Sequence, residues 1–212
     1  MLPNPALYAR VSATAQAAEH YLFASQLVGR SRPTHVRKLS RQDAQWLPAL
    51  ADLLIDGVHQ GASLGFLAPL SRAAALDYWQ AVFAQLGPRQ SLWIACEGEQ
   101  VECADGPLQG AVQLSLCPRA NAHHRGEVQR LMVHSHSRGR GIASQLMSRA
   151  ECAAQAQGRT LLVLEAPAGS QAEAVYVHLG WQRAGEIPDY DACAEGQLHS
   201  SAMYYKRLQT LR

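Results

Sequence analysis

The chain has 212 residues, of which 48% are hydrophobic and 17% are charged, and its formal net charge is only +2. This length suffices for one ordinary domain with an appendage, and the composition excludes an intrinsically disordered chain. So small a net charge gives no reason to expect nucleic acid or an anionic membrane as a partner.

Cysteine usage and hydropathy bear on the cellular compartment. The five cysteines are an odd number and include no C-x-x-C pair, so neither a disulfide framework nor a structural zinc site is indicated. No apolar run approaches the roughly 20 residues of a membrane span, and the N-terminus lacks the pattern of a signal peptide. We therefore expect a cytoplasmic protein with reduced thiols.

The first 33 residues differ from the rest of the chain. Residues 11–28 are rich in alanine and predict a helix, and residues 29–33 (GRSRP) indicate a linker, because Gly and Pro break helices. The sequence thus predicts an N-terminal extension over 1–33 and a main domain over 34–212. The extension either docks as an extra helix, mediates a contact or has no role.

From Thr34 onward, strand and helix patterns alternate. Ser40 with Asp43, Ser71, and Ser170 with Glu173 are the expected helix caps. The order predicts an α/β (α+β) fold with a mixed, mostly antiparallel sheet of about seven strands and about four flanking helices. Strands are predicted near 34–39, 92–97, 109–116, 127–133, 160–165, 181–186 and 201–208, and helices over 42–56, 71–86, 142–157 and 170–179.

The start of the helix after Gly141 departs from the usual pattern. A helix N-terminus favours a Ser, Thr, Asp or Asn cap and acidic residues in its first turn. Residues 138–143 (RGRGIA) offer arginines and glycines instead. An external anion would complete such a start, because free N–H groups and the helix dipole favour phosphate, and glycine allows close approach. The sequence therefore predicts a phosphorylated cofactor here.

Three classes of phosphate site were compared with this stretch. A nucleoside-triphosphate loop needs G-x-x-x-x-G-K-[S/T], which is absent from the sequence. A dinucleotide site needs G-x-G-x-x-G/A, which residues 139–144 nearly match, with Glu165 in the position of a ribose-binding acid. Its third small residue is a serine, however, and the unit begins late in the chain. The third class is coenzyme A.

Arg138-x-x-Gly141-x-Ala143 after a strand resembles the acyl-CoA pyrophosphate motif of the GNAT (Gcn5-related) N-acetyltransferases. The resemblance covers roughly residues 34–208, through 127–133 (EVQRLMV), 161–165 (LLVLE), 169–173 (GSQAE), Tyr176 and 179–181 (LGW). Residues 58–66 (VHQGASLGF), 113–117 (QLSLC) and the tail from Ile187 to Lys206 resemble more narrowly the tabtoxin-resistance acetyltransferases.

The resemblance implies acetyl-CoA as co-substrate and assigns residues to it. Backbone amides of the 139–144 turn would hold the pyrophosphate, and the strand ending at Val133 would pair with the pantetheine arm. The implied cofactor-binding residues are Leu131, Met132, Val133, Arg138, Gly139, Arg140, Gly141, Ile142, Ala143 and Ser144.

The resemblance also implies catalytic roles for Glu127, Glu165 and Tyr176. Either acid would be the general base, and the Tyr176 hydroxyl would protonate the leaving thiolate. An ordinary carboxylate is a feeble base for an ammonium ion, so we expect burial to raise the pKa of the base or water to relay the proton. The alternative is that Glu127 has only a structural role, in which it caps the edge of a strand or pairs with Arg130. The relative has aspartate in place of Glu165.

Histidines and the acceptor side complete the candidate residues. The narrower resemblance implies that His59, Phe66 and Tyr190 line the acceptor side. His134 and His136 share one strand face, but metal binding needs at least a third ligand, so no metal is expected.

The sequence thus predicts an N-acetyltransferase that moves acetyl from acetyl-CoA to a primary amine of a small molecule, by direct attack in a ternary complex. The narrower resemblance suggests an amino-acid-like toxin or antibiotic as acceptor. Two alternatives stay open, namely acetylation of a protein lysine or N-terminus and a non-catalytic acyl-CoA sensor. The protein is expected to be a monomer or a homodimer.

Overall fold

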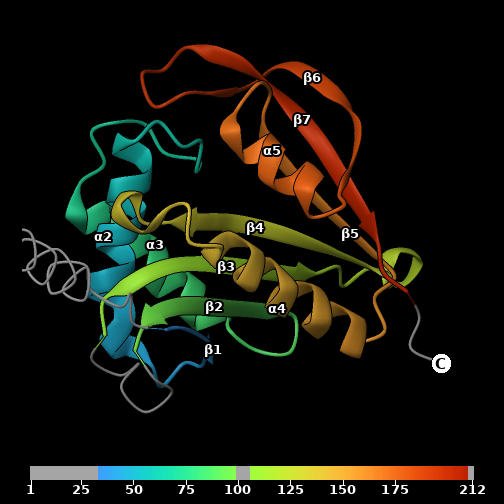
Figure 1. The fold of residues 1–212 in the computed structure, drawn as a ribbon, viewed down its shortest axis with the longest axis horizontal. Helices are drawn as coiled ribbons and strands as arrows, with labels where there is room; N and C mark the ends of the chain where they lie inside the picture. The colour runs from blue at the N-terminus through green and yellow to red at the C-terminus, as the bar shows by residue number, and fades with distance from the viewer. Residues whose placement is uncertain (1–32, 99–105, 210–212) are drawn as a thin grey trace, which may run out of the picture. The chain divides into compact units, whose positions relative to one another are not determined.

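A computed structural model describes residues 33–98 and 106–209 of the chain (Figure 1). The helix predicted within the N-terminal extension lies outside the described residues. The boundary at residue 33 therefore stays a prediction.

In the part of the chain that the structure describes, seven strands form one sheet in the order β1-β2-β3-β4-β5-β7-β6 (Figure 1). Every neighbouring pair is antiparallel except β4 and β5, which run parallel. The predicted mixed, mostly antiparallel sheet is confirmed. Its strands are β1 (Thr34–Leu39), β2 (Gln90–Glu97), β3 (Leu108–Leu116), β4 (Arg125–Val133), β5 (Leu161–Pro167), β6 (Gln182–Ala192) and β7 (Leu198–Arg207).

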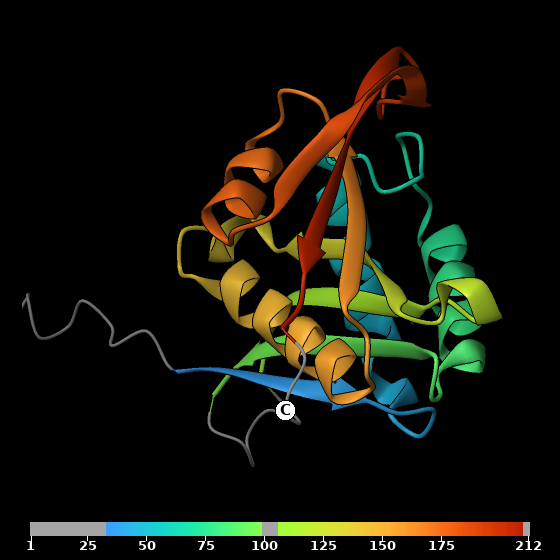
Figure 2. The ribbon, with the colours of Figure 1, turned by 90° about the vertical axis from the view of Figure 1, so that its right-hand side faces the viewer.

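Within the described residues, four α-helices cover the two faces of the sheet. α2 (Leu47–His59) and α3 (Arg72–Gln85) pack on one face, and α4 (Ile142–Ala156) and α5 (Gln171–His178) lie on the other (Figure 2). Each face has its own core. Leu50 and Trp79 are fully buried in the first core, as are Leu146 and Leu162 in the second. Burial of apolar side chains on both faces stabilises the sheet between two helical layers.

The first helix begins later than the sequence pattern predicts. A helix from Gln42 would place Pro48 in its interior, where the ring clashes with the preceding turn. The structure instead has a short 3-10 turn, η1 (Ala44–Trp46), and α2 begins at Leu47, so that proline falls in its first turn. The Ser40 N–H and hydroxyl donate to the Asp43 carboxylate at 2.8 and 2.7 Å. These two hydrogen bonds close a turn that precedes α2 and do not cap the helix itself. The predicted helix cap at Ser40 and Asp43 was therefore wrong.

The other two predicted caps have different outcomes. Ser71 caps α3, because its hydroxyl accepts from the Ala74 N–H at 3.1 Å. Ser170 is the N-cap residue of α5, but its hydroxyl makes no capping bond. Glu173 completes this helix start by accepting from the Gly169 N–H at 2.5 Å. The predicted reciprocal capping box is therefore absent. Of the two predicted partners, only the Glu173 carboxylate makes a bond at the helix start.

Two findings bear on the compartment. Cys96 is disulfide-bonded, so the expectation of reduced thiols was wrong at this position. No helix in residues 33–98 or 106–209 is both long and apolar enough to cross a membrane. The cytoplasmic location stays a prediction.

Candidate functional site

The candidate site opens where the two parallel strands separate. β4 and β5 pair only between Arg125–Glu127 and Leu161–Val163, although both strands continue beyond that point. Figure 1 shows the two strands diverging from their shared end. From Val128 onward the β5-facing edge of β4 has no strand partner, which leaves backbone N–H and C=O groups available to a ligand.

A cavity of about 1330 Å³ occupies this opening. Its walls come from β3, β4 and β5, from α2 and α3 on one side, and from the start of α4 and most of α5 on the other. Small-molecule and cofactor sites commonly form concave spaces of this kind between secondary elements. The cavity is large enough to hold a long cofactor arm together with a small acceptor.

The structure brings most of the predicted site residues to this one cavity. Arg140, His59, Phe66 and Tyr190 are not among its lining residues. Lining it are Glu127, Leu131, Met132, Val133, Arg138, Gly139, Gly141, Ile142, Ala143, Ser144, Glu165 and Tyr176.

The N-terminus of α4 is uncapped, as the sequence predicts. Gly141 is the N-cap residue, with φ of 73°, and as a glycine it offers no side chain to cap the helix. Gly139 has φ of 75°, and a Cβ built on either glycine would meet no atom within 4 Å. Both residues need the left-handed conformation that glycine adopts without strain. The open space over these two positions and the bare helix N–H groups fit a diphosphate.

The two arginines of this turn point to different surroundings. Arg138 lines the cavity beside the glycines. Arg140 lies 3.6 Å from Glu97, the last residue of β2, through its Nη2 atom. Arg138 is therefore the better placed of the two for an anion in the cavity.

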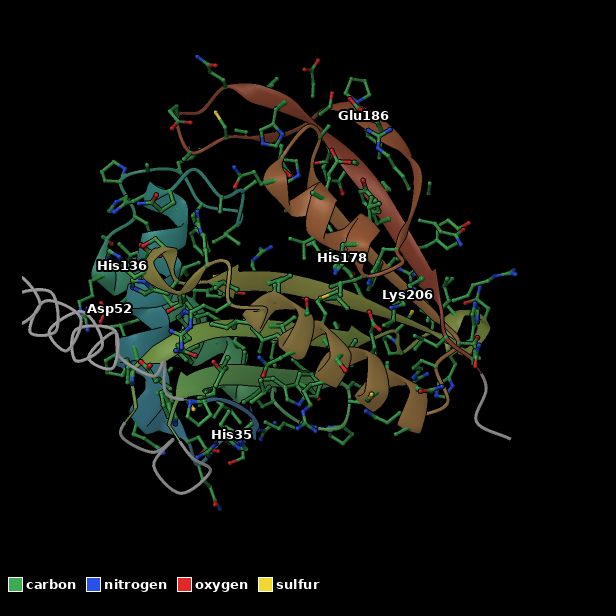
Figure 3. The ribbon with its side chains drawn as sticks, viewed as in Figure 1. His35, Asp52, His136, His178, Glu186 and Lys206 are labelled. Carbon is green, nitrogen blue, oxygen red and sulfur yellow. The ribbon has the colours of Figure 1, made fainter. Side chains whose placement is uncertain are left out.

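A hydrogen-bonded link ties this turn to α2. The backbone N–H and the hydroxyl of Ser135 both donate to the Asp56 carboxylate at 2.8 Å. The His134 ring lies 3.9 Å from the same carboxylate and stacks on the ring of His136, which Figure 3 labels. Burial alone would raise the pKa of Asp56, but the bonds from Ser135 and the charges of His134 and Arg138 hold it below its ordinary value. Asp56 thus positions the segment that leads into the Arg138–Gly141 turn.

Glu127 and Glu165 reach the cavity from β4 and β5, but both side chains are exposed. The expected burial of the base is therefore not observed. Gln129 donates to the Glu127 carboxylate at 2.9 Å, and no ion pair joins Glu127 to Arg130. The predicted alternative of a Glu127–Arg130 pair was wrong.

Tyr190 reaches the acids from β6. Hydrogen bonding to Glu165, together with the negative charges of Glu165, Asp191 and Glu127, raises the pKa of Tyr190. Tyr190 therefore lies near Glu165, but it is exposed and does not line the cavity itself.

Tyr176 lines the cavity from α5 and is only 7% exposed. Burial raises the pKa of Tyr176 to about 12. An ordinary thiol has a pKa near 8.5, so complete transfer of the phenolic proton to a thiolate would be uphill. The hydroxyl is better suited to donating a hydrogen bond to negative charge on sulfur.

The cavity lining also includes polar residues that sequence reasoning did not assign to the site. Tyr78, Gln90, Gln113 and Arg130 all line the cavity. Gln113 is 2% exposed; it donates to the Tyr78 hydroxyl at 2.7 Å and accepts from the Gln90 side chain at 3.1 Å. A glutamine between the apolar residues Val112 and Leu114 of β3 was the signal in the sequence, because buried amides are kept where they have partners.

Histidine clustering gives no support for a metal centre. Within residues 33–98 and 106–209, no three His, Cys, Asp or Glu side chains come together as metal ligands. The pair His134 and His136 instead packs at the Asp56 link described above.

Comparison with known proteins adds a family likeness to this geometry. Residues 88–183 match the family described as "Acetyltransferase (GNAT) domain". An N-acetyltransferase from Staphylococcus aureus Mu50 is 18% identical, with a TM-score of 0.66 over 84% of this chain and 99% of that one. YncA from Salmonella typhimurium, an acetyltransferase solved with its cofactor acetyl-CoA, is 15% identical, with a TM-score of 0.64 over 83% and 94% of the two chains.

A third structure is similar to this chain at the level of the fold. It is a GNAT superfamily phosphinothricin acetyltransferase from Sinorhizobium meliloti in complex with AcCoA. It is 16% identical, with a TM-score of 0.63 over 82% of this chain and 88% of that one. The seven-stranded sheet with four helices is therefore the GNAT fold, as the sequence predicts.

Proposed function

We propose that this chain, whose residues 88–183 match the GNAT acetyltransferase domain, transfers acetyl from acetyl-CoA to a primary amine of a small molecule. The observation that carries this proposal is a single cavity that joins the uncapped start of α4 to Glu127 and Glu165. A diphosphate at the glycine turn and an arm along the unpaired edge of β4 would place a thioester between the separated strands. The acceptor amine would enter from the side of α2 and α3.

The residues that would hold the cofactor divide by the group they contact. Backbone N–H groups around Gly139 and Gly141, with Arg138, would bind the diphosphate. The edge of β4 from Leu131 to Val133 would pair with amide groups of the arm. The open positions over both glycines support this assignment, since a Cβ there would fill the space that the diphosphate needs. When bound, acetyl-CoA supplies an activated acyl group.

The chain's own side chains would then handle two protons. Glu127 or Glu165, through water, takes a proton from the ammonium group, and the free amine forms the C–N bond to the thioester carbon. The C–S bond breaks, and the Tyr176 hydroxyl donates a hydrogen bond to the departing sulfur. The sulfur finally takes a proton from solvent or from the former ammonium group. Positioning alone can contribute roughly 7–11 kcal/mol to such a reaction.

A coupled assay tests the proposal. Full-length protein, acetyl-CoA and a panel of primary amines are incubated, and release of free thiol is followed together with the mass of the acetylated product. The proposal predicts thiol release in step with N-acetylated amine for at least one small molecule. Tight binding of acetyl-CoA with no product from any small amine, but with acetylation of lysine peptides or protein N-termini, would favour a protein acetyltransferase. Binding with no acceptor at all would favour a sensor.

A further inference from the structure

Arg130 stands at an irregular point of β4, inside the cavity. The register between β3 and β4 shifts between Ala111 and Gln113, and Arg130 there has φ of 50°, which is unusual for a residue with a side chain. Backbone strain of this kind persists where the surrounding structure holds it, often at ligand sites. The bulge aims the side chain at α3 and the 61–65 loop.

The guanidinium of Arg130 is held in place without any counter-ion. It lies over the Tyr78 ring, with its Cζ atom 6.0 Å from the ring centroid. A Cβ on Gly65 would come within 2.9 Å of its Nη2 atom, so the loop approaches it as closely as glycine permits. Its Nε atom is buried and has no hydrogen-bond partner. Among the described residues no carboxylate pairs with Arg130.

Arg130 is partly buried, and its Nε atom is withdrawn from water without a partner, so an anionic ligand would complete its contacts. Removing a charged group from water without a partner carries a large penalty. A guanidinium has five donors in a planar fork that matches a carboxylate. Tyr78, Gln90 and Gln113 around it form a neutral hydrogen-bonded network, so they offer it no negative charge.

The opposite charge lies at the other end of the same cavity. Glu127 and Glu165 line it where β4 and β5 separate. Glu127 precedes Arg130 by three residues on β4, which is on the order of 10 Å along a strand. The cavity is thus negative where the amine would react and positive toward α3.

We propose that Arg130 binds a carboxylate of the acceptor, so that the substrates are zwitterions that carry both a primary amine and a carboxylate. This inference rests on the proposed function and names the substrate class of that site. The ammonium group is drawn to the two glutamates, and the carboxylate to the guanidinium. Such a molecule satisfies both ends of the cavity at once.

The test compares matched acceptors that differ only in the anionic group. L-amino acids and ω-amino acids of increasing length are each compared with their carboxamides, and kcat/KM is measured for thiol release. The wild-type protein is expected to prefer the acid over the amide by about 10- to 100-fold, the range of one hydrogen-bonded charge pair. In Arg130→Met, kcat/KM for the acid should fall to the value for its carboxamide, so that the preference disappears. The affinity for acetyl-CoA, measured by calorimetry, should stay unchanged. Equal use of acids and amides by the wild-type protein would overturn the inference and leave the proposed function intact.

Two further variants and a binding assay keep the outcomes separate. Arg130→Lys retains the charge and should recover part of the preference, whereas Arg89→Met, an exposed arginine outside the cavity lining, should leave it intact. Where no amine is acetylated, the same acid and amide pairs are titrated into protein saturated with coenzyme A. Binding of acids that depends on Arg130 would then uphold the inference while the proposed function fails. Equal binding of both forms, or none, would refute it.

Discussion

Asp56 on α2 accepts both the backbone N–H and the hydroxyl of Ser135 at 2.8 Å, and so joins a helix of one face of the sheet to the turn that begins α4. We expect Asp56→Asn to weaken acetyl-CoA binding by about 10-fold, because bonds to a charged carboxylate contribute roughly 1.5–3 kcal/mol. Calorimetry measures this affinity. Asp52→Asn is the matched control, since Asp52 lies one turn earlier on α2, exposed and paired with Arg72 (Figure 3). Equal effects of both substitutions would show that Asp56 does not position the turn.

The same carboxylate gives a stability difference that depends on pH. The pKa of Asp56 lies below its ordinary value of 3.8 in the folded chain. Its contribution is therefore complete above that ordinary value and is lost as pH falls through the lower folded value. The free energy of unfolding in urea should be higher for wild type than for Asp56→Asn at pH 7. This difference should become smaller on acidification below about pH 4. A gap that widens on acidification would contradict this assignment.

Gly141→Ala should reduce acetyl-CoA affinity by at least about 10-fold, because a side chain at this position strains the backbone and enters the space over the helix start. Gly158→Ala offers a close control. Gly158 also has φ of 73° and open surroundings, but it follows the other end of α4, outside the cavity lining. Thermal unfolding should show similar destabilisation of the two variants, and binding should fall only for Gly141→Ala. Parallel losses of binding would mean that the glycine turn serves stability alone.

Glu127→Gln and Glu165→Gln test the base. General base catalysis typically contributes 10²–10⁴-fold, so we expect kcat to fall by about 100-fold in the variant that removes the base, with KM for acetyl-CoA unchanged. The second variant should have a smaller effect through loss of charge in the cavity. Glu186→Gln, on the exposed face of β6, is the control. Full activity in both Glu127→Gln and Glu165→Gln would rule out a carboxylate base.

Tyr176→Phe should lower kcat by about 10- to 100-fold if the Tyr176 hydroxyl donates a hydrogen bond to the leaving sulfur. Tyr205→Phe is the control. The pKa of about 12 keeps Tyr176 protonated, so the rate should show no decline from its ionisation between pH 7 and about pH 10. A decline in that range that disappears in Tyr176→Phe would contradict the raised pKa.

Because the folded pKa exceeds the ordinary value of 10.0, Tyr176 should also stop contributing to stability as pH rises from 10 toward 12.

The sequence predicted the parts of the fold that depend on local pattern. Alternation and helical spacing placed all seven strands and four helices, and the unusual start of α4 was visible because glycine and arginine stand where caps are expected. The errors came from competition between local rules. Pro48 prevents the helix that Ser40 and Asp43 would start, and Glu173 bonds to Gly169 where the reciprocal capping box was expected.

The acceptor side of the site was less predictable. The orientation of Arg130 depends on a bulge set by the register of β3 and β4, which no single-sequence pattern specifies. Tyr78 and Gln113 meet across 35 positions of sequence, and only the packing of α3 on the sheet brings them together. Tyr190 was predicted to line the acceptor side, but it is not among the residues that line the cavity. Long-range packing, rather than residue identity, decides these contacts.

Calorimetric titration of the full-length protein with acetyl-CoA and with S-acetylpantetheine, which lacks the diphosphate, separates the role of the glycine turn from that of the arm. If the turn around Gly141 binds the diphosphate, acetyl-CoA should bind at least about 100-fold more tightly, since several charge-assisted bonds are lost with the truncated ligand. The difference should shrink in Gly141→Ala. Equal affinity for both ligands, or no binding of acetyl-CoA, would contradict the assignment of this turn as the cofactor site.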